Sequence, residues 1–283
     1  MTGVLVTGGT GKTGGALVGL LRAGGVPVHV ASRNPAAGDP DAVRFDWSDP
    51  ATFTDALRSM DRVFLVPPVE SVDPMPLVQP FLKQAQAAGV RRVVLLGSAI
   101  VLPNAPSALD LADYVRAQRG WVVLRASGFM QNFLRPHPLG KSINRFREIS
   151  TAAGDGRLGW IDARDIAASA AALLTDGVGA QREDDDYLLT GPKALSYQEA
   201  ADIISAHTGR HVRVNKITTE QQIAAYRSAG MPAEFASALA SVEEGIRAGR
   251  EDRVSTAVLD LTGRSPRPFA EFVTDHAPDW HQP

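Results

Sequence analysis

A glycine-rich stretch near the start of the chain constrains the fold more than any other feature of the sequence. A short apolar segment, Val4–Thr7, precedes it, and an amphipathic segment, Lys12–Ala23, follows it. Glycines at such a turn let backbone N–H groups approach a phosphate, and the helix that begins there adds partial positive charge. The pattern predicts a strand, a turn and a helix around a dinucleotide pyrophosphate. The residues expected to contact the dinucleotide here are Gly8, Thr10, Gly11, Lys12, Thr13 and Gly14.

Two other interpretations of this turn stay open. Gly11, Lys12 and Thr13 resemble the end of a triphosphatase P-loop, but that motif requires a glycine five residues before Gly11, where Val6 stands. A glycine turn without any ligand is the second alternative. The strand–turn–helix context, with further strand candidates behind it, favours dinucleotide binding.

The first part of the chain alternates short apolar segments with amphipathic ones. This alternation predicts an α/β fold, a Rossmann-type doubly wound parallel sheet, and residues 1–127 are expected to form its dinucleotide-binding domain. The expected strands are Val4–Thr7, Val26–Ser32, Val43–Asp46, Arg62–Val66, Val93–Gly97 and Trp121–Arg125. The expected helices are Lys12–Ala23, Ala51–Ser59, Met75–Ala88 and Leu109–Gln118.

Residues 128–283 are expected to form a smaller, mostly helical substrate-binding lobe, with segments at about 158–190 returning to the sheet. Prolines and glycines predict a long irregular segment over Gly128–Gly156, and such a loop beside a pocket is often a lid. Further helices are expected near Arg164–Thr175, after a Ser196 cap with Glu199, and at three later stretches. Those stretches are Thr218–Ala229, Pro232–Ala248 and Asp252–Leu261.

Composition removes several classes of function. The formal charge of −2 argues against a nucleic-acid binder, and the lack of cysteine excludes disulfides and thiolate ligands. No apolar run reaches the ~18–20 residues of a membrane span, and the N-terminus lacks the layout of a signal peptide. We therefore expect a cytoplasmic protein, with no membrane partner and no metal site, that acts on a small molecule as a monomer or homodimer.

The end of the second predicted strand indicates which dinucleotide binds. NAD-selective folds place an acidic residue there, whereas this chain has Ser32, Arg33 and Asn34. A guanidinium suits a 2′-phosphate and a carboxylate would repel it, so NADP(H) is the predicted cofactor. The alternative is that Arg33 is a solvated loop residue.

Further along the strand ends, other residues are expected beside the cofactor. Asp46 and Trp47 are candidates for adenine contact, although Trp47 has an alternative as simple core. Val66, Pro67 and Pro68 are expected to pass beside the ribose and nicotinamide. Ser98, at the end of the fifth strand, is expected to touch nicotinamide or substrate, or merely to terminate the strand.

Several motifs carry a resemblance to a known family. The chain resembles the NmrA-like atypical short-chain dehydrogenase/reductases, and most closely the ergot-alkaloid festuclavine/agroclavine dehydrogenase family. The resemblance implies an NADPH-dependent reductase that acts on an iminium or conjugated carbonyl compound, and it covers nearly the whole chain. The motifs that carry it are Thr7–Thr13, Val30–Arg33, Phe45–Trp47, Phe129–Phe133, Gly154–Gly156, Gly230–Pro232, Glu251–Arg253 and Thr262–Arg267.

The usual Tyr-x-x-x-Lys pair of short-chain dehydrogenases is missing from this sequence. Gln118, Gly191, Ala201 and Gly230 stand four residues after the four tyrosines. Hydride addition to a cationic iminium carbon needs no general acid, whereas a quinone or enone requires a proton donor. The missing pair therefore favours an imine or iminium acceptor over a ketone.

The remaining candidates follow the fifth and sixth strands. Ser98, Asn132 and His137 are the catalytic candidates, with His137 as a proton donor or an exposed loop residue. Phe129, Met130, Phe133, Trp160 and Tyr226 are the predicted substrate pocket, with core packing as the alternative. Two other functions stay open, a non-catalytic NADP(H)-sensing regulator of the NmrA type and an NADPH:quinone oxidoreductase.

Overall fold

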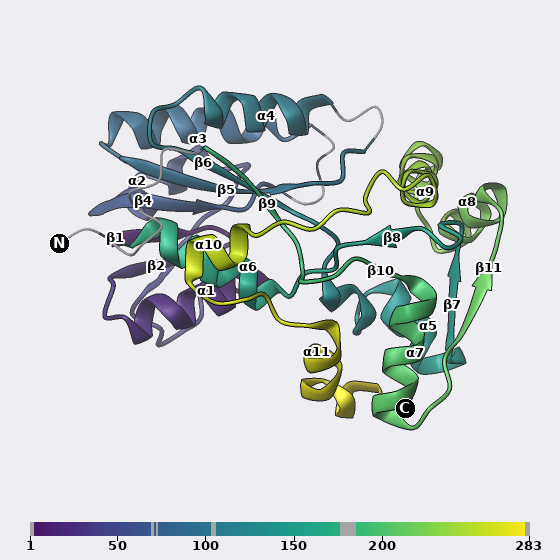
Figure 1. Ribbon diagram of the computed structural model, residues 1–283. Coiled ribbons are helices and arrows are strands. Elements are labelled where there is room, and N and C mark those ends of the chain that lie inside the picture. Colours follow the sequence, from purple (N-terminus) through teal and green to yellow (C-terminus); the bar gives the residue numbers. More distant parts are fainter. Residues whose placement is uncertain (1–2, 69–70, 72, 103–105, 176–184, 281–283) are drawn as a thin grey trace.

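A seven-stranded parallel sheet forms one half of the protein in the computed structural model (Figure 1). The structure describes residues 3–68, 71, 73–102, 106–175 and 185–280. The strand order is β3-β2-β1-β4-β5-β6-β9, and its reversal beside β1 is that of a Rossmann fold, so the predicted fold class is confirmed. The strands are β1 (Gly3–Val6), β2 (Val28–Ser32), β3 (Ala42–Arg44), β4 (Met60–Leu65), β5 (Arg92–Ser98), β6 (Val122–Ala126) and β9 (Asp186–Leu189).

Helices cover both faces of this sheet because its strands are apolar on both sides. Val4 and Val6 of β1 join one buried cluster, and Leu5, between them, joins the other. One face is covered by α1 (Lys12–Ala23), α6 (Ala163–Leu174) and α10 (Ala257–Thr262). The other is covered by α2 (Phe53–Leu57), which follows the short η1 (Pro50–Thr52), and by α3 (Met75–Ala87) and α4 (Pro106–Arg116).

The predicted elements of this half match the observed ones closely. The first helix has the predicted bounds, and the other strands and helices differ by a few residues at their ends. The chain later returns to the sheet, where α6 packs on α1 and β9 pairs with β6 in parallel. Residues 176–184, within the stretch predicted to return, lie outside the described residues.

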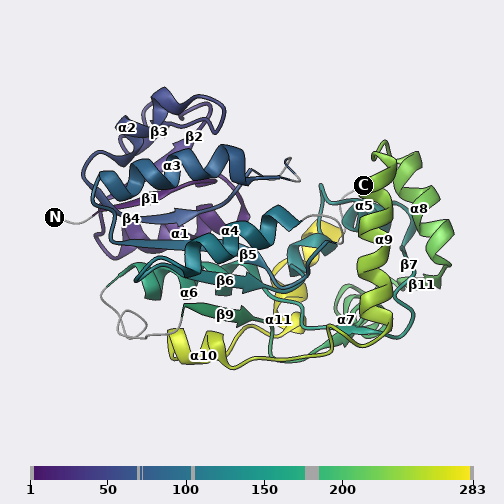
Figure 2. The same cartoon turned by 90° about the horizontal axis from the view of Figure 1, so that it is seen from above.

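The second lobe lies beside the carboxyl end of the sheet (Figures 1 and 2). It has its own apolar core, in which Phe133, Trp160, Phe272 and Trp280 are buried. Its helices are η2 (Met130–Phe133), α5 (Pro138–Phe146), α7 (Tyr197–Thr208), α8 (Thr219–Ser228), α9 (Ala233–Arg247), α11 (Phe269–Asp275) and η4 (Ala277–Trp280). Two small sheets complete it, with β7 (Glu148–Thr151) beside β11 (Arg213–Lys216) and β8 (Arg157–Leu158) beside β10 (Leu195–Ser196).

The segment predicted to be irregular, residues 128–156, is instead ordered, with η2, α5 and β7 in it. Pro138 is the first residue of α5, where a missing N–H costs no hydrogen bond. Gly140 and Gly156 have no space for a side chain. A Cβ on Gly140 would lie 2.2 Å from the carbonyl carbon of Leu134, and a Cβ on Gly156 would lie 2.1 Å from the carbonyl oxygen of Ile246. The prediction was wrong because residues that usually break helices here serve packing and capping.

Other predictions for the second lobe hold in part. Ser196 and Glu199 form the predicted capping box of α7. The helix expected over Asp252–Leu261 begins only at Ala257. Among the described residues, no helix has both the length and the apolar character that crossing a membrane demands.

Candidate functional site

Two glycines of the turn between β1 and α1 are required there, one for its backbone conformation and the other for lack of space. Gly8 has a φ of +63°, which L residues rarely adopt, and its carbonyl oxygen accepts a hydrogen bond from the Gly11 N–H at 2.9 Å. A Cβ on Gly14 would lie 2.2 Å from the Gly8 oxygen. Thr7 joins the turn to the end of β4, because its hydroxyl accepts from the Val66 N–H at 2.7 Å.

The first turn of α1 is suited to an anion. Its N-cap, Gly11, supplies no side-chain hydrogen bond, and the first turn carries no acidic residue. The hydroxyl of Thr13 is buried without a hydrogen-bond partner. A pyrophosphate bound at this end would supply the acceptor and the negative charge that the helix lacks, so these residues fit the predicted cofactor.

A first cavity, of about 610 Å³, opens beside this turn along β2 and β3. Within it the Ser32 hydroxyl and the Asn34 backbone form a turn, and the exposed Arg33 between them forms no ion pair among the described residues. Asp46 Oδ1 accepts from the N–H and hydroxyl of Ser48, which lowers the pKa of Asp46. Most of the predicted cofactor residues line this one cavity: Gly8, Thr10, Ser32, Arg33, Asn34, Asp46, Trp47, Val66, Pro67 and Pro68.

Trp47 also belongs to the packed part of this region. Its ring makes edge contacts with Phe45 and Phe81, at centroid distances of 4.8 and 5.4 Å. The Trp47 side chain therefore packs against the core and also lines the cavity, so its position agrees with both interpretations.

Two more cavities continue from the first one across the carboxyl end of the sheet. A middle cavity, of about 800 Å³, shares Val66 and Pro67 with the first. A lobe cavity, of about 550 Å³, shares Ile100, Leu239 and Val242 with the middle one. The shared wall residues make the three cavities neighbours in a row from Arg33 to the second lobe, and we call this row the cofactor–lobe trench.

Ser98 and Phe129 line the middle cavity. The Ser98 hydroxyl donates to the Ile100 carbonyl at 2.7 Å and accepts from the Ile100 N–H at 3.1 Å. Its proton is thus held by the backbone, which suits the interpretation of Ser98 as a strand terminator as well as a cofactor contact.

The lobe cavity collects only part of the predicted substrate pocket. Asn132, His137, Trp160 and Tyr226 line it. Met130 and Phe133 are instead 1% and 0% exposed and belong to the lobe core, where the Phe133 ring contacts Trp160 edge-on. For Met130 and Phe133 the structure therefore agrees with the alternative interpretation, in which these side chains pack in the core.

His137 is half-buried and caps α5, and it is not the exposed loop residue that was one alternative. Its Nδ1 accepts from the Leu139 N–H at 3.2 Å. Burial, followed by the positive charge of Lys12, lowers the pKa of His137 from 6.5 to about 4. A lowered pKa favours the neutral ring at pH 7, and the role of His137 as a proton donor stays a prediction.

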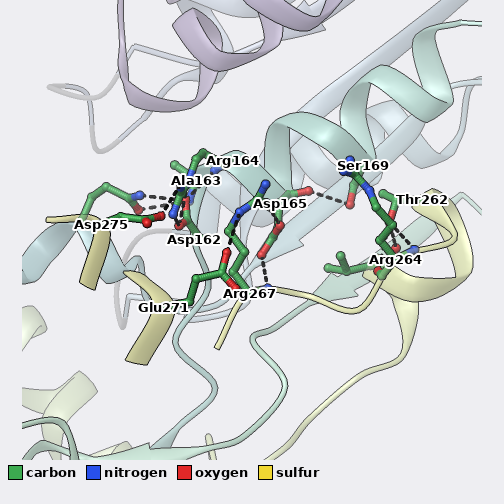
Figure 3. A network of polar contacts seen from close by, with 12 residues as sticks. Asp162, Ala163, Arg164, Asp165, Ser169, Thr262, Arg264, Arg267, Glu271 and Asp275 are labelled. Carbon is green, nitrogen blue, oxygen red and sulfur yellow. Dashed lines mark hydrogen bonds and ion pairs between the residues drawn. The ribbon is translucent and has the colours of Figure 1, made fainter. Parts of the chain in front are cut away.

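A polar network fixes η2 between the glycine turn and the lobe. The Gln131 carbonyl accepts from Lys12 Nζ at 3.4 Å, and its side-chain amide donates to Asp162 Oδ1 at 3.0 Å. Asp162, which is fully buried, also accepts from Arg164 and caps α6 (Figure 3). The buried carboxylate therefore holds the segment that carries Asn132.

The same network ties the C-terminal part of the chain to α6. Arg164 reaches Asp275 on α11 at 2.8 Å, and Asp165 accepts from the Arg267 N–H at 2.7 Å (Figure 3). Burial raises the pKa of Asp165, although the contact with Arg267 opposes this. Asp162 is the residue that caps α6, and Asp165, in its first turn, pairs with Arg267.

Five polar residues that line the lobe cavity were not predicted from the sequence: Ser142, Ser150, Tyr197, Gln222 and Glu243. Glu243 stands beside Glu244 in the sequence, and only the helix packing decides which of the two is buried. Gln222 lies on α8, whose sequence has little amphipathic pattern. No local signal distinguishes these residues, because the cavity joins segments far apart in the chain.

Fold and turn together define a Rossmann-type nicotinamide-dinucleotide protein. A model of the NAD(P)H-binding family matches residues 8–177. The oxidoreductase YesF of Bacillus subtilis is 41% identical over 98% of this chain and 96% of its own. Agroclavine dehydrogenase of Claviceps fusiformis is 35% identical over 98% of each chain.

The solved structures agree on the fold. The NADPH-dependent quinone oxidoreductase QOR2 of Escherichia coli superposes with a TM-score of 0.81 at 24% identity, over 96% of this chain and 99% of that one. The chain belongs to the NAD(P)H-binding family, and its relatives at 30% identity or more include proteins named agroclavine dehydrogenase and festuclavine dehydrogenase. The family predicted from the motifs is confirmed, and the predicted cofactor, NADP(H), agrees with it.

Proposed function

We propose that the protein is an NADPH-dependent reductase that transfers hydride to a small organic acceptor, an imine or iminium ion or a conjugated carbonyl compound. The observation that carries this proposal is the cofactor–lobe trench, whose cavities share wall residues from the glycine turn to an apolar lobe cavity. In this proposal residues 1–127 bind the cofactor and residues 128–283 supply most of the substrate site, in a monomer or homodimer.

The first cavity favours the phosphorylated dinucleotide. Arg33 forms no ion pair among the described residues and acts on Asp46 of the same cavity only at longer range, so its guanidinium is available to a 2′-phosphate. Ser32 and Asn34 add neutral hydrogen-bonding groups on either side. NADPH, when bound, supplies the hydride.

The scarcity of proton donors favours an acceptor that needs no proton. The Ser98 proton is held by the Ile100 carbonyl, and His137 is neutral at pH 7. Tyr226 donates its proton to Glu243 at 2.8 Å, and burial, helped by that negative charge, raises the pKa of Tyr226. An iminium carbon takes up hydride and becomes a neutral amine without any of these groups, so it suits the cavity better than a ketone.

The walls of the lobe cavity would then exclude water and orient the acceptor. Trp160 is buried and held by its Nε1–H, which donates to the Leu195 carbonyl at 3.2 Å. Among the polar side chains that line the lobe cavity, Asn132 is nearest in sequence to the sixth strand, and it lies on the segment that the Asp162 network holds. These residues bind and position, and none needs to move a proton.

The test is the loss of NADPH absorbance with three panels of acceptors: cyclic iminium ions, enones and quinones. We expect turnover with the iminium panel, slower turnover with enones, and a lower rate with NADH than with NADPH. Turnover of quinones alone would contradict the proposal in favour of a quinone oxidoreductase. Tight NADPH binding with no turnover on any panel would contradict it in favour of a sensor.

A further inference from the structure

A buried carboxylate, on the C-terminal half of α9, lies in the wall of the lobe cavity. Glu243 is 7% exposed, and its two oxygens accept three hydrogen bonds. Oε2 accepts from the Thr151 hydroxyl at 2.9 Å and the Ala152 N–H at 2.6 Å, and Oε1 accepts from the Tyr226 hydroxyl at 2.8 Å. These donors fix the carboxylate in one position without neutralising its charge.

No cation pairs with Glu243 in the part of the chain that the structure describes. Its neighbour Glu244 takes the nearest arginine, Arg247, at 3.7 Å. The other titratable side chains in the cavity wall are His137, with its pKa of about 4, and Tyr197 and Tyr226, whose pKa values are raised by burial and by Glu243. The wall therefore carries a single formal charge, and it is negative.

A second acceptor lines the same cavity. Gln222, on α8, is 5% exposed, and its side-chain Oε1 is buried without a hydrogen-bond partner. A buried acceptor left unpaired costs ~1–3 kcal/mol, which a ligand N–H would recover. Gln222 and Tyr226 are four residues apart and so lie on one face of α8.

Much of the rest of the wall is apolar. Leu158, Trp160, Leu239, Val242 and Ile246 line the cavity, and the partly exposed Phe235 belongs to the same wall. The other polar lining residues, Asn132, His137, Ser142, Ser150 and Tyr197, carry no negative charge. A largely apolar cavity with one charged acceptor and one unpaired neutral acceptor matches an apolar molecule that carries a positive nitrogen with an N–H.

We infer that Glu243, with Tyr226 and Gln222, forms a subsite that binds the cationic nitrogen of the substrate and selects charged acceptors over neutral ones of the same shape. This inference rests on the proposed function, because it names the substrate property that the lobe cavity selects. Glu243 acts by binding and does not exchange a proton in the reaction.

The experiment uses two probes that have no C=N, C=O or conjugated C=C group to accept hydride, so binding is measured without turnover. Protonated 1,2,3,4-tetrahydroisoquinoline carries the charge and the N–H, and 1,2,3,4-tetrahydronaphthalene is its neutral counterpart. Calorimetric titration of the NADPH-loaded protein should show the ammonium binding at least about tenfold more tightly than the hydrocarbon, as expected for a charge-assisted hydrogen bond. Equal affinities for the two probes would overturn the inference without any variant.

The variants locate the preference. Glu243→Gln should reduce the preference about tenfold while leaving the hydrocarbon affinity unchanged. Glu244→Gln is the matched control, since that side chain bonds to Thr219 and lies outside the cavity wall, and it should change nothing. Should Glu243→Gln fail to fold, Gln222→Met removes the unpaired acceptor and should weaken ammonium binding alone. An unchanged preference in a folded Glu243→Gln or Gln222→Met protein would overturn the inference.

The two proposals fail separately. A protein that prefers the ammonium yet oxidises no NADPH with any acceptor contradicts the proposed reductase and leaves the subsite standing. A protein that turns over iminium ions but binds both probes equally contradicts only the subsite.

Discussion

The two ends of the cofactor–lobe trench are built in different ways. At the glycine turn the site consists of backbone, and its shape depends on glycines that leave no space for a Cβ, as at Gly14. At the lobe cavity the site consists of side chains, such as Glu243 and Tyr226, that come from separate helices and a small sheet. The first end is fixed by local geometry and the second by tertiary packing.

This difference separates cofactor handling from substrate choice. A backbone cradle can change only by distorting the fold, whereas a side chain of α8 or α9 can change with the cradle intact. Relatives can therefore share the first end and differ at the second. Substitutions at Gly14, Arg33 and His137 test this contrast.

Gly14→Ala should have the largest effect on cofactor binding. The new Cβ would lie 2.2 Å from the Gly8 carbonyl oxygen, and relief of this clash would require the backbone of the turn to move. We expect the Kd for NADPH to rise about 100-fold or more, which corresponds to ~3 kcal/mol. Calorimetric titration measures it, with circular dichroism and Tm to show that the variant is folded.

Gly19→Ala is the control for that substitution, because it lies on the same helix with nothing within 4 Å of the added Cβ. It should leave NADPH affinity unchanged and raise stability by ~0.5–1 kcal/mol, as expected for alanine inside a helix. If the folded Gly14→Ala protein bound NADPH as tightly as the wild-type protein, cofactor binding would not depend on the close packing of the glycine turn.

Arg33→Ala should have a smaller and selective effect. Removing the guanidinium from the first cavity should weaken NADPH binding ~10–50-fold and leave NADH binding nearly unchanged, because only NADPH carries the 2′-phosphate. Parallel titrations with the two cofactors measure the ratio. Equal losses for both would show that Arg33 does not read that phosphate.

His137→Asn should have the smallest effect, on stability as a function of pH. The folded pKa is about 4 against an ordinary value of 6.5, so between these pH values the unfolded chain binds a proton that the folded chain does not. Stability from this residue is therefore lost as the pH falls from 6.5 toward 4. Asparagine keeps the cap of α5 but cannot titrate.

Urea unfolding at pH 7 and pH 5 checks this prediction. The wild-type free energy of unfolding should fall by on the order of 1 kcal/mol more than that of the variant between the two pH values. A fall of the same size in both proteins would mean that His137 is not held in its neutral form.

Local patterns were sufficient for the sheet half of the molecule. The alternation of strands and helices and the spacing of Gly8, Gly11 and Gly14 depend on near neighbours in the chain, so the fold class and the turn were predictable. The lobe was less predictable, because Gly140 and Gly156 are set by contacts with Leu134 and Ile246. Sequence alone cannot show those contacts.

The candidate site follows the same division. Residues at strand ends, such as Arg33 and Trp47, were found because the carboxyl edge of a parallel sheet is where a Rossmann site lies. Glu243 was missed, since a buried acid in a helix looks like any exposed acid in the sequence. Phe133 was assigned to the pocket because its segment follows β6, although the side chain turns into the lobe core.

The most direct test of the account is a crystal structure of the NADPH complex. The adenosine 2′-phosphate should lie at Arg33 and the pyrophosphate over the N-terminus of α1, with the nicotinamide in the middle cavity beside Ser98 and its reactive face open to the lobe cavity. A nicotinamide that points away from the lobe cavity, or a cofactor bound elsewhere, would contradict it.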